Sequence, residues 1–498
     1  MYIRINEQDN VGIALQPLSA DAALDIAGEQ LVLIEDIPQG HKFALRDLSA
    51  GENIIKYASA MGRVTQDIPR GAWVHTHNVK TNLEGELEYE YAPVPPQTPP
   101  EVTPQTFRGF RRANGSVGVR NEIWILPTVS CTNQTATLIN RAATEKLQAA
   151  GEQGLVDGIY EFKHPYGCSQ MGDDLLNTQK MLSAMAKHPN AAGVLILGLG
   201  CENNRIQELQ KVMGDYDGQR ISFLVAQDVE DEVAVGSDMI VDLVRQAGAD
   251  RREEVPLSHL KLGLKCGGSD GLSGITANPL VGRVSDLLVA QGGTSVLTEV
   301  PEMFGAEQIL MNRAQDEVVF GKIVELINGF KNYFISHGQP VYENPSPGNK
   351  DGGITTLEDK SLGCTEKGGY SPVMDVVDYG DIVTTSGLNL LCSPGNDLVA
   401  TTALAAAGCQ VVLFTTGRGT PFGTCVPTMK IATNTKLYDF KRNWMDFNAG
   451  TLVEGDNFDD TAQRLLDDVI AVISGERLAK NEEMEFRDIA FWKTGVTV

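Results

Sequence analysis

The sequence predicts an α/β protein with a small all-β unit at its N-terminus. From about residue 107 onward, short apolar runs that end in polar turns alternate with helical stretches, which is typical of parallel α/β layers. Before residue 92, short segments of alternating apolar and polar residues are separated by turn signals, which is typical of a small β domain. A proline-rich stretch between these two parts indicates a domain boundary.

Length and composition restrict the classes of function. A chain of 498 residues is too long for one core, so several domains are expected. The formal net charge of −24 argues against a nucleic-acid surface, which would need clustered lysine and arginine. The sequence shows no signal segment and no apolar run long enough to span a membrane, so no membrane contact is expected. Eight cysteines without a CxxC pair predict free thiols in a reducing cytoplasm.

The N-terminal part ends in a segment, residues 72–79, that we predict to be a strand. His75 and His77 are two residues apart, so a strand would place both side chains on the same face. Such a pair suits a metal or acid/base role, and a polar strand face without chemistry is the alternative. Residues 92–106 then contain six prolines in fifteen residues, which predicts a semi-rigid, extended linker.

The stretch Lys265–Gly274 carries the densest set of reactive groups in the chain. It follows an apolar run over residues 259–264, read as a buried strand, and precedes an expected helix over residues 275–291. A glycine-rich turn before a helix N-terminus presents backbone N–H groups to an anion. The turn also contains an ammonium, a thiol, a hydroxyl and a carboxylate, from Lys265, Cys266, Ser269 and Asp270. We interpret it as a catalytic loop; the alternative is a connector whose cysteine only packs.

Polar turns follow most of the predicted parallel strands. Since the ligand crevice of such sheets lies beyond the carboxyl ends of the strands, these turns are expected to converge. Together they supply thiols, carboxylates and cations: Cys131, Cys168, Cys201 and Cys266; Asp270, Glu299 and Glu302; Lys265 and Arg418. Thiolates from separate loops suit iron or an iron–sulfur cluster better than magnesium or calcium. Each cysteine taken singly can instead be a small buried hydrophobe.

Several cofactor motifs are absent from the sequence. It contains no P-loop and no GxGxxG after a strand, so neither a nucleotide nor NAD is expected. It also lacks the GxSxG nucleophile elbow of the α/β-hydrolases. The remaining acid/base groups, with a soft metal, suit proton abstraction next to a carboxylate. The enolate is then stabilised electrostatically and a β-hydroxyl is expelled.

Long motifs spread over almost the whole chain resemble those of the altronate/galactarate dehydratase family. They are residues Gly40–Leu45, His75–Asn78, Arg111–Gly115, Gly198–Asn204, Lys265–Gly271, Glu299–Glu307, Asn344–Lys350 and Thr416–Pro421. The resemblance implies an N-terminal SAF-type β-clip domain over residues 1–91 and the linker over 92–106. It also implies a middle α/β domain, used in dimerisation, over residues 107–257. The expected C-terminal domain, over 258–498, is Rossmann-like, with a parallel sheet and without a nucleotide.

The resemblance also implies an activity, a metal and an assembly. The expected reaction is dehydration of a sugar acid, D-altronate, to 2-dehydro-3-deoxy-D-gluconate in hexuronate (galacturonate) breakdown. The expected cofactor is Fe²⁺, with Mn²⁺ as an alternative, and the expected assembly is a cytoplasmic homodimer. Cys131, Cys168, Cys201 and Cys266 match cysteines of the family motifs, and their role as metal ligands is our inference. Cys364 resembles a feature of one branch of the family only.

The expected roles within the site remain alternatives. Lys265 or Glu299 is the predicted base, Glu302 or His75 the predicted acid, and Arg418 or Lys265 the predicted partner of the substrate carboxylate. Asp270 and His77 complete the catalytic candidates, and the candidate substrate-binding residues are Gly267, Gly268, Ser269, Asn203, Arg418 and Thr420. Galactarate or another aldarate is the alternative substrate, and a sugar-acid-binding protein is the non-enzymatic alternative. Both a single iron ion and a labile iron–sulfur cluster are consistent with four separate cysteines.

Overall fold

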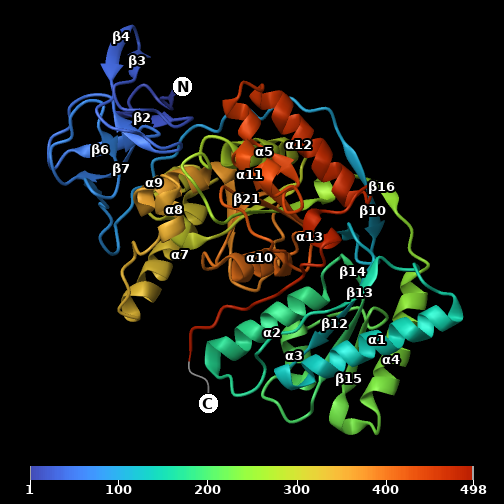
Figure 1. Cartoon of the computed structure of the whole chain (residues 1–498). Coiled ribbons are helices and arrows are strands. Elements are labelled where there is room, and N and C mark those ends of the chain that lie inside the picture. The colour runs from blue at the N-terminus through green and yellow to red at the C-terminus, as the bar shows by residue number, and fades with distance from the viewer. Residues whose placement is uncertain (1, 496–498) are drawn as a thin grey trace.

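The computed structural model describes residues 2–495 and begins with an all-β part, drawn in blue in Figure 1. Four strands form an antiparallel sheet in the order β1-β2-β5-β8: β1 (Tyr2–Ile3), β2 (Val11–Ala14), β5 (Lys42–Ala44) and β8 (Trp73–Val74). Beside it lie a hairpin and a three-stranded sheet, made by β3 (Ala23–Ile26) and β4 (Glu29–Val32), and by β6 (Asn53–Lys56), β7 (Ser59–Val64) and β9 (Val79–Lys80). The prediction of an N-terminal all-β unit is confirmed.

A four-stranded parallel sheet forms the middle of the chain. Its order is β13-β12-β14-β15, from β13 (Gly158–Glu161), β12 (Glu122–Pro127), β14 (Ala191–Gly198) and β15 (Ile221–Val225). Helices α1 (Asn133–Ala150) and α4 (Glu232–Ala247) bury apolar residues against one face. Helices α2 (Gly172–Ala186) and α3 (Ile206–Met213) cover the other face. A small antiparallel sheet joins this unit to the rest, through β10 (Thr106–Arg111), β11 (Val117–Gly118) and β16 (Glu253–Pro256).

A seven-stranded parallel sheet organises the C-terminal part. Its order is β19-β20-β18-β17-β21-β22-β23, and the strands are β17 (Lys261–Cys266), β18 (Thr294–Leu297), β19 (Val373–Val377), β20 (Gly387–Leu391), β21 (Val411–Thr416), β22 (Thr428–Ala432) and β23 (Phe447–Asn448). The largest apolar core lies between this sheet and helices α5 (Ala277–Ala290), α7 (Glu317–Ser336) and α12 (Phe458–Ile473). Helix α10 (Asp397–Ala406) packs with α2 in the core on the opposite face. The predicted α/β class is therefore confirmed. No helix between residues 2 and 495 combines the length and apolar character needed to cross a bilayer.

Side chains set two local boundaries. Helices α6 (Glu307–Met311) and α7 are separate, and Asp316 caps α7 by accepting from Val319 N at 2.9 Å. The strand expected over residues 72–79 ends at Val74, because Asn78 Oδ1 accepts from His75 N at 2.9 Å and closes a turn.

The β domain docks on the C-terminal part beside helices α8 (Pro347–Asp351) and α9 (Leu357–Thr365), as Figure 1 shows. Gly271 needs to be glycine here, since a Cβ atom would lie 2.0 Å from Gly40 O of the β domain. An ion triad also crosses this junction. Lys42 Nζ and Lys56 Nζ lie 2.8 and 2.9 Å from the two carboxylate oxygens of Asp359, and all three side chains are buried. The glycine-rich loop is therefore fixed directly under the β domain.

Candidate active site

Seven ionisable side chains converge, fully buried, beyond the carboxyl ends of β17 and β18. We call them the buried cluster: Lys265, Cys266, Glu299, Glu302, Lys360, Cys364 and Lys367. Lys265 and Cys266 are the last residues of β17, and the two glutamates follow β18. The remaining three come from α9 and the 3-10 turn after it, Glu366–Gly368. Charged groups are rarely buried without partners, so each member must be paired.

Lys265 is held by four oxygen atoms. Its Nζ donates to Cys266 O at 2.6 Å, Glu299 Oε1 at 2.5 Å, Gly395 O at 3.2 Å and Asp397 Oδ1 at 3.1 Å. Burial opposes the charge on Lys265, but Glu299 and Asp397 outweigh it and raise the pKa of Lys265 above its ordinary value. Lys265 is therefore an ammonium group at neutral pH and a poor base.

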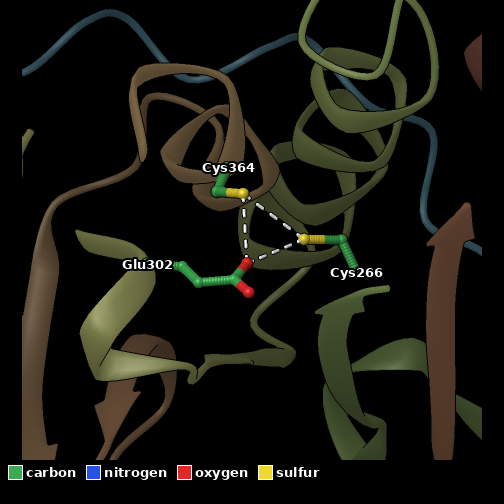
Figure 2. A group of neighbouring side chains, drawn as sticks. All are labelled: Cys266, Glu302 and Cys364. Carbon is green, nitrogen blue, oxygen red and sulfur yellow. Dashed lines mark hydrogen bonds between the residues drawn. The ribbon is translucent and has the colours of Figure 1, made fainter. Parts of the chain in front are cut away.

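Figure 2 shows Cys266, Cys364 and Glu302 pointing toward one another. The two Sγ atoms are 3.4 Å apart, and each lies 3.3 Å from Glu302 Oε2. A hydrogen bond from Cys364, together with the ammonium of Lys367 at 2.9 Å, lowers the pKa of Cys266 to about 6. The same hydrogen bond and burial raise the pKa of Cys364, so one thiolate and one thiol face each other at neutral pH.

The two glutamates have opposite charge preferences. Burial and the Cys266 thiolate raise the pKa of Glu299 to about 8. Burial also disfavours ionisation of Glu302, but Lys360 at 2.8 Å and Lys265 outweigh it and hold the pKa of Glu302 well below its ordinary range. Two carboxyl groups of one short segment are thus held in different protonation states, which is a common arrangement for an acid and a base.

Three half-buried residues separate the buried cluster from solvent. Asn344 Nδ2 donates to Glu302 Oε1 at 3.3 Å. Gly395 and Asp397 both accept from Lys265, and a Cβ atom on Gly395 would lie 3.5 Å from Glu302 Oε1. These three residues are thus half-buried neighbours of the buried cluster.

The glycine-rich loop borders a second space, at the junction with the β domain. A cavity of about 470 Å³ is lined there by, among others, Gly40, Asp270, Asp351, Arg418, Asn434 and Lys436. On the other side of Asp270, about 10 Å³ next to Ser269, Lys360 and Cys364 is roughly room for one water molecule. The Ser269 hydroxyl is buried and has no protein partner among residues 2–495. Asp270 of the loop borders both spaces, so the loop lies between the large cavity and the buried cluster.

The predicted residues of this loop have mixed roles. Asp270 accepts from Thr433 and Asn434 as well as from Ser273, and so ties the loop to the end of β22. Gly268 has a φ of +60° and accepts from Arg418 N at 2.9 Å. A Cβ atom on Gly267 would lie 2.6 Å from the Asp397 carboxylate. The Arg418 side chain is exposed, and Thr420 is half-buried in the same turn.

The two predicted histidines lie in the β domain, outside the buried cluster. The turn closed by Asn78 buries His75, whose Nδ1 lies 3.1 Å from Thr355 Oγ1, and exposes His77. The prediction that they share one face of a strand is wrong, because the strand ends before them. Burial lowers the pKa of His75 to about 3, so it is neutral and cannot donate a proton as an imidazolium at neutral pH.

Cys131, Cys168 and Cys201 lie apart from Cys266, on loops of the four-stranded sheet, and all three are exposed. Asn203 belongs to the same loops, where its Oδ1 accepts from Ser169 N at 2.9 Å. The structure therefore divides the four predicted metal ligands between two sheets. In place of the other three, it puts Cys364 beside Cys266.

Sequence reasoning missed Lys360, Lys367 and Asp397, and it left Cys364 outside the site. A signal was available for three of these residues. Lys360, Cys364 and Lys367 are spaced i, i+4 and i+7, which places them on one face of a helix. A helix face with two lysines and a thiol, all fully buried, requires anionic partners from elsewhere in the fold.

Three family models match consecutive parts of the chain. They are described as the altronate/galactarate dehydratase SAF domain (residues 1–82), the D-galactarate dehydratase/altronate hydrolase second domain (109–248) and the D-galactarate/altronate dehydratase C-terminal domain (257–497). Together these models cover nearly the whole chain.

Curated relatives match along the full length. An altronate dehydratase of Bacillus subtilis (strain 168) is 53% identical over 499 residues, which cover 100% of this chain and 99% of the relative. An altronate dehydratase of Escherichia coli (strain K12) is 51% identical over 498 residues, covering 100% of both chains. A galactarate dehydratase (L-threo-forming) of Escherichia coli (strain K12) is 35% identical, covering 96% of this chain and 93% of the relative. The chain therefore belongs to the altronate/galactarate dehydratase family.

Proposed function

We propose that the protein is a hydro-lyase that converts D-altronate to 2-dehydro-3-deoxy-D-gluconate and water. The observation that carries this proposal is the full-length identity of 51–53% to two altronate dehydratases, against 35% to a galactarate dehydratase. The buried cluster supports the reaction class, since it combines an ionised carboxylate, a protonated carboxyl group and fixed ammonium groups. In this proposal the reaction belongs to hexuronate breakdown. The enzyme acts in the cytoplasm as a homodimer.

The charge states of the cluster assign roles to its members. Glu302, ionised, takes the α-proton of the sugar acid. The Lys265 ammonium faces the enolate that forms, since it keeps its charge and its Nζ lies next to the half-buried Gly395 and Asp397. Glu299, protonated near neutral pH, donates the proton that the departing β-hydroxyl needs. This assignment exchanges the acid and base roles that the sequence suggested for the two glutamates.

The substrate carboxylate requires a cation at the edge of the glycine-rich loop. Arg418 is exposed beside Gly268 and lines the 470 Å³ cavity together with Lys436. A guanidinium binds a carboxylate through two parallel hydrogen bonds, which orient the acid as well as hold it. We assign the substrate carboxylate to Arg418, on the cavity side of the glycine-rich loop.

Iron is the metal that the family resemblance implies. The ligand atoms of Cys266, Cys364 and Glu302 all lie within 4.8 Å of one another, and thiolate and carboxylate donors are compatible with a metal ion. Two of these donors are already paired with ammonium groups, Cys266 with Lys367 at 2.9 Å and Glu302 with Lys360 at 2.8 Å. An ion at this place would have to displace the two ammonium groups from these donors. It would then supply Lewis acidity next to the glutamates.

A panel of sugar acids tests the proposed function. Reduced, anaerobically purified protein supplied with Fe²⁺ or Mn²⁺ is incubated with D-altronate, galactarate and D-gluconate, and the 2-keto product is measured. D-Altronate is expected to have the highest kcat/KM by at least about tenfold, equivalent to 1.4 kcal/mol. Higher kcat/KM with galactarate would assign the protein to the other branch, and tight binding of altronate without turnover would make it a binding protein.

A further inference from the structure

Three of the eight cysteines are exposed, and all three lie at the carboxyl edge of the four-stranded sheet. Cys131 follows β12, Cys168 lies between β13 and α2, and Cys201 follows β14. β12 pairs with both β13 and β14 in parallel, so the three chain segments leave the sheet side by side. The other five cysteines are buried or half-buried, as free cysteine usually is. Packing in an apolar core does not account for these three exposed cysteines, whereas a ligand that they bind would.

Hydrogen bonds fasten the three loops to one another. Ser130 N, next to Cys131, donates to Tyr166 O at 2.9 Å. On either side of Cys168, Gly167 O accepts from Asn204 N at 3.0 Å and Ser169 N donates to Asn203 Oδ1 at 2.9 Å. These last two bonds reach the loop of Cys201. The three thiols therefore belong to one fixed surface and not to three independent loops.

The electrostatic setting of this surface favours a bound anion. Helices α1, α2 and α3 begin at residues 133, 172 and 206, two to five residues after Cys131, Cys168 and Cys201. None of the three has a side chain that caps its first turn, whereas Asp231 caps α4 of the same domain. Helix N-termini carry partial positive charge and free N–H groups. Three such N-termini beside three thiols favour an anionic group bound at this surface.

The spacing of the thiols argues against a single ion held by all three. Among the described residues, Cys266, Glu302 and Cys364 form the one set of three such donors whose ligand atoms all lie within 4.8 Å of one another. Cys131, Cys168 and Cys201 are not such a set, so they do not surround one ion. A cluster of several iron and sulfide ions separates its thiolate ligands further.

We propose that Cys131, Cys168 and Cys201 bind an iron–sulfur cluster that has three protein ligands. Each thiol releases its proton when it binds iron. With three ligands from the protein, one iron of a four-iron cluster is left open to an external oxygen ligand and is a Lewis acid at the rim of the middle domain. The site is separate from the buried cluster, where Lys367 already pairs with the Cys266 thiolate.

The test is metal and sulfide analysis of anaerobically reconstituted full-length protein. Wild type and the variants Cys131→Ser, Cys168→Ser and Cys201→Ser are incubated with iron and sulfide, desalted, and measured for bound iron, acid-labile sulfide, visible absorption and Mössbauer spectrum. Cys266→Ser and Cys392→Ser are matched controls. Wild type and both controls are expected to retain iron and sulfide in equal numbers, whereas each of the other three variants loses most of both.

The three substitutions are at exposed positions, so circular dichroism is expected to show wild-type folding, and loss of the cluster can be separated from unfolding. Iron bound without sulfide by the wild type would overturn the proposal. So would retention of sulfide by all three serine variants, or loss of it in Cys266→Ser alone. None of these measurements uses turnover of altronate, so failure here and failure of the proposed function are distinguishable.

Discussion

Glu299 and Glu302 are three residues apart and yet differ in protonation because of what each one faces. Glu302 Oε1 accepts from Lys360 and Asn344, so its charge is compensated. Glu299 shares its surroundings with the Cys266 thiolate, whose charge opposes a second anion. Glu299 also has a φ of +71°, an unfavourable backbone conformation for a residue with a Cβ atom. The strained backbone conformation therefore occurs at the residue whose carboxyl group contacts Lys265.

Replacing the proposed base without changing its shape gives the sharpest test at this scale. Glu302→Gln keeps the side-chain volume but cannot accept a proton, so kcat is expected to fall about 10²- to 10⁴-fold with little change in KM. Glu307→Gln is the matched control, because Glu307 is equally buried and its Oε1 lies 2.8 Å from Lys331 Nζ outside the cluster. Steady-state kinetics of both variants decide the matter. Equal activity of Glu302→Gln and wild type would remove Glu302 from the mechanism.

The sequence could predict the half of the site that parallel-sheet topology brings together. Lys265, Cys266, Glu299 and Glu302 follow adjacent strands, and the carboxyl ends of adjacent parallel strands meet at one edge. Lys360 could not be placed in this way, because α9 lies in a long connection between α7 and β19 and follows no strand of the sheet. Its position depends on packing against the β domain, which strand order and periodicity do not report.

Helix α9 connects the β domain to the buried cluster. All of its residues are buried, and neighbouring positions serve different partners. Asp359 pairs with Lys42 and Lys56 of the β domain, whereas Lys360 pairs with Glu302 of the cluster. Because both partners hold consecutive residues of one helix, displacement of the β domain would move Lys360 away from Glu302. Docking of the β domain and the charge state of the proposed base are therefore linked.

Asp359→Asn tests this junction. The change leaves two buried lysines facing a neutral group, so unfolding free energy is expected to fall by about 3–5 kcal/mol at neutral pH. Chemical denaturation measures it, with Asp238→Asn as the control. Asp238 forms an exposed ion pair with Lys146 at 2.6 Å, for which a loss of at most about 1 kcal/mol is expected. Similar losses in both variants would show that the triad does not hold the junction.

The difference in unfolding free energy between wild type and Asp359→Asn is expected to depend on pH in one direction. Burial opposes ionisation of Asp359, but Lys42 and Lys56 outweigh it and hold the pKa of Asp359 below its ordinary value. The ion triad therefore stabilises the fold fully above about pH 4, the pKa of an unfolded aspartate. As the pH falls below that value, the stability difference between wild type and Asp359→Asn is expected to shrink. A difference that grows in acid would contradict the assigned ion triad.

At the scale of the whole molecule, the chain carries two parallel sheets, and cysteines lie at the carboxyl edge of each. The fold class was predictable because apolar runs, polar turns and helical stretches recur in order along the chain. Strand order was not predictable. Cys266 and the three cysteines of the middle sheet belong to different sheets, in agreement with the domain boundary expected at residue 257. The β domain contacts the loop after β17 through Gly40, and Figure 1 shows it beside α8 and α9.

A substrate bound at the junction of the β domain should stabilise the two parts together. Gly40 of the β domain and Arg418 of the C-terminal part line the same cavity, so a ligand there contacts both. At a concentration of 100 times its dissociation constant, D-altronate is expected to stabilise the wild type by about 2.7 kcal/mol, measured as a rise in Tm. In Arg418→Ala the loss of charge-assisted hydrogen bonds is expected to weaken binding about 10- to 100-fold, which at the same ligand concentration leaves about 1.4 to 0.4 kcal/mol of that stabilisation. The control is Arg464→Ala, which should keep the full rise in Tm. Arg464 is an exposed residue of α12 that pairs with Asp456. If Arg418→Ala retained the full rise as well, the substrate carboxylate would have to bind outside this cavity.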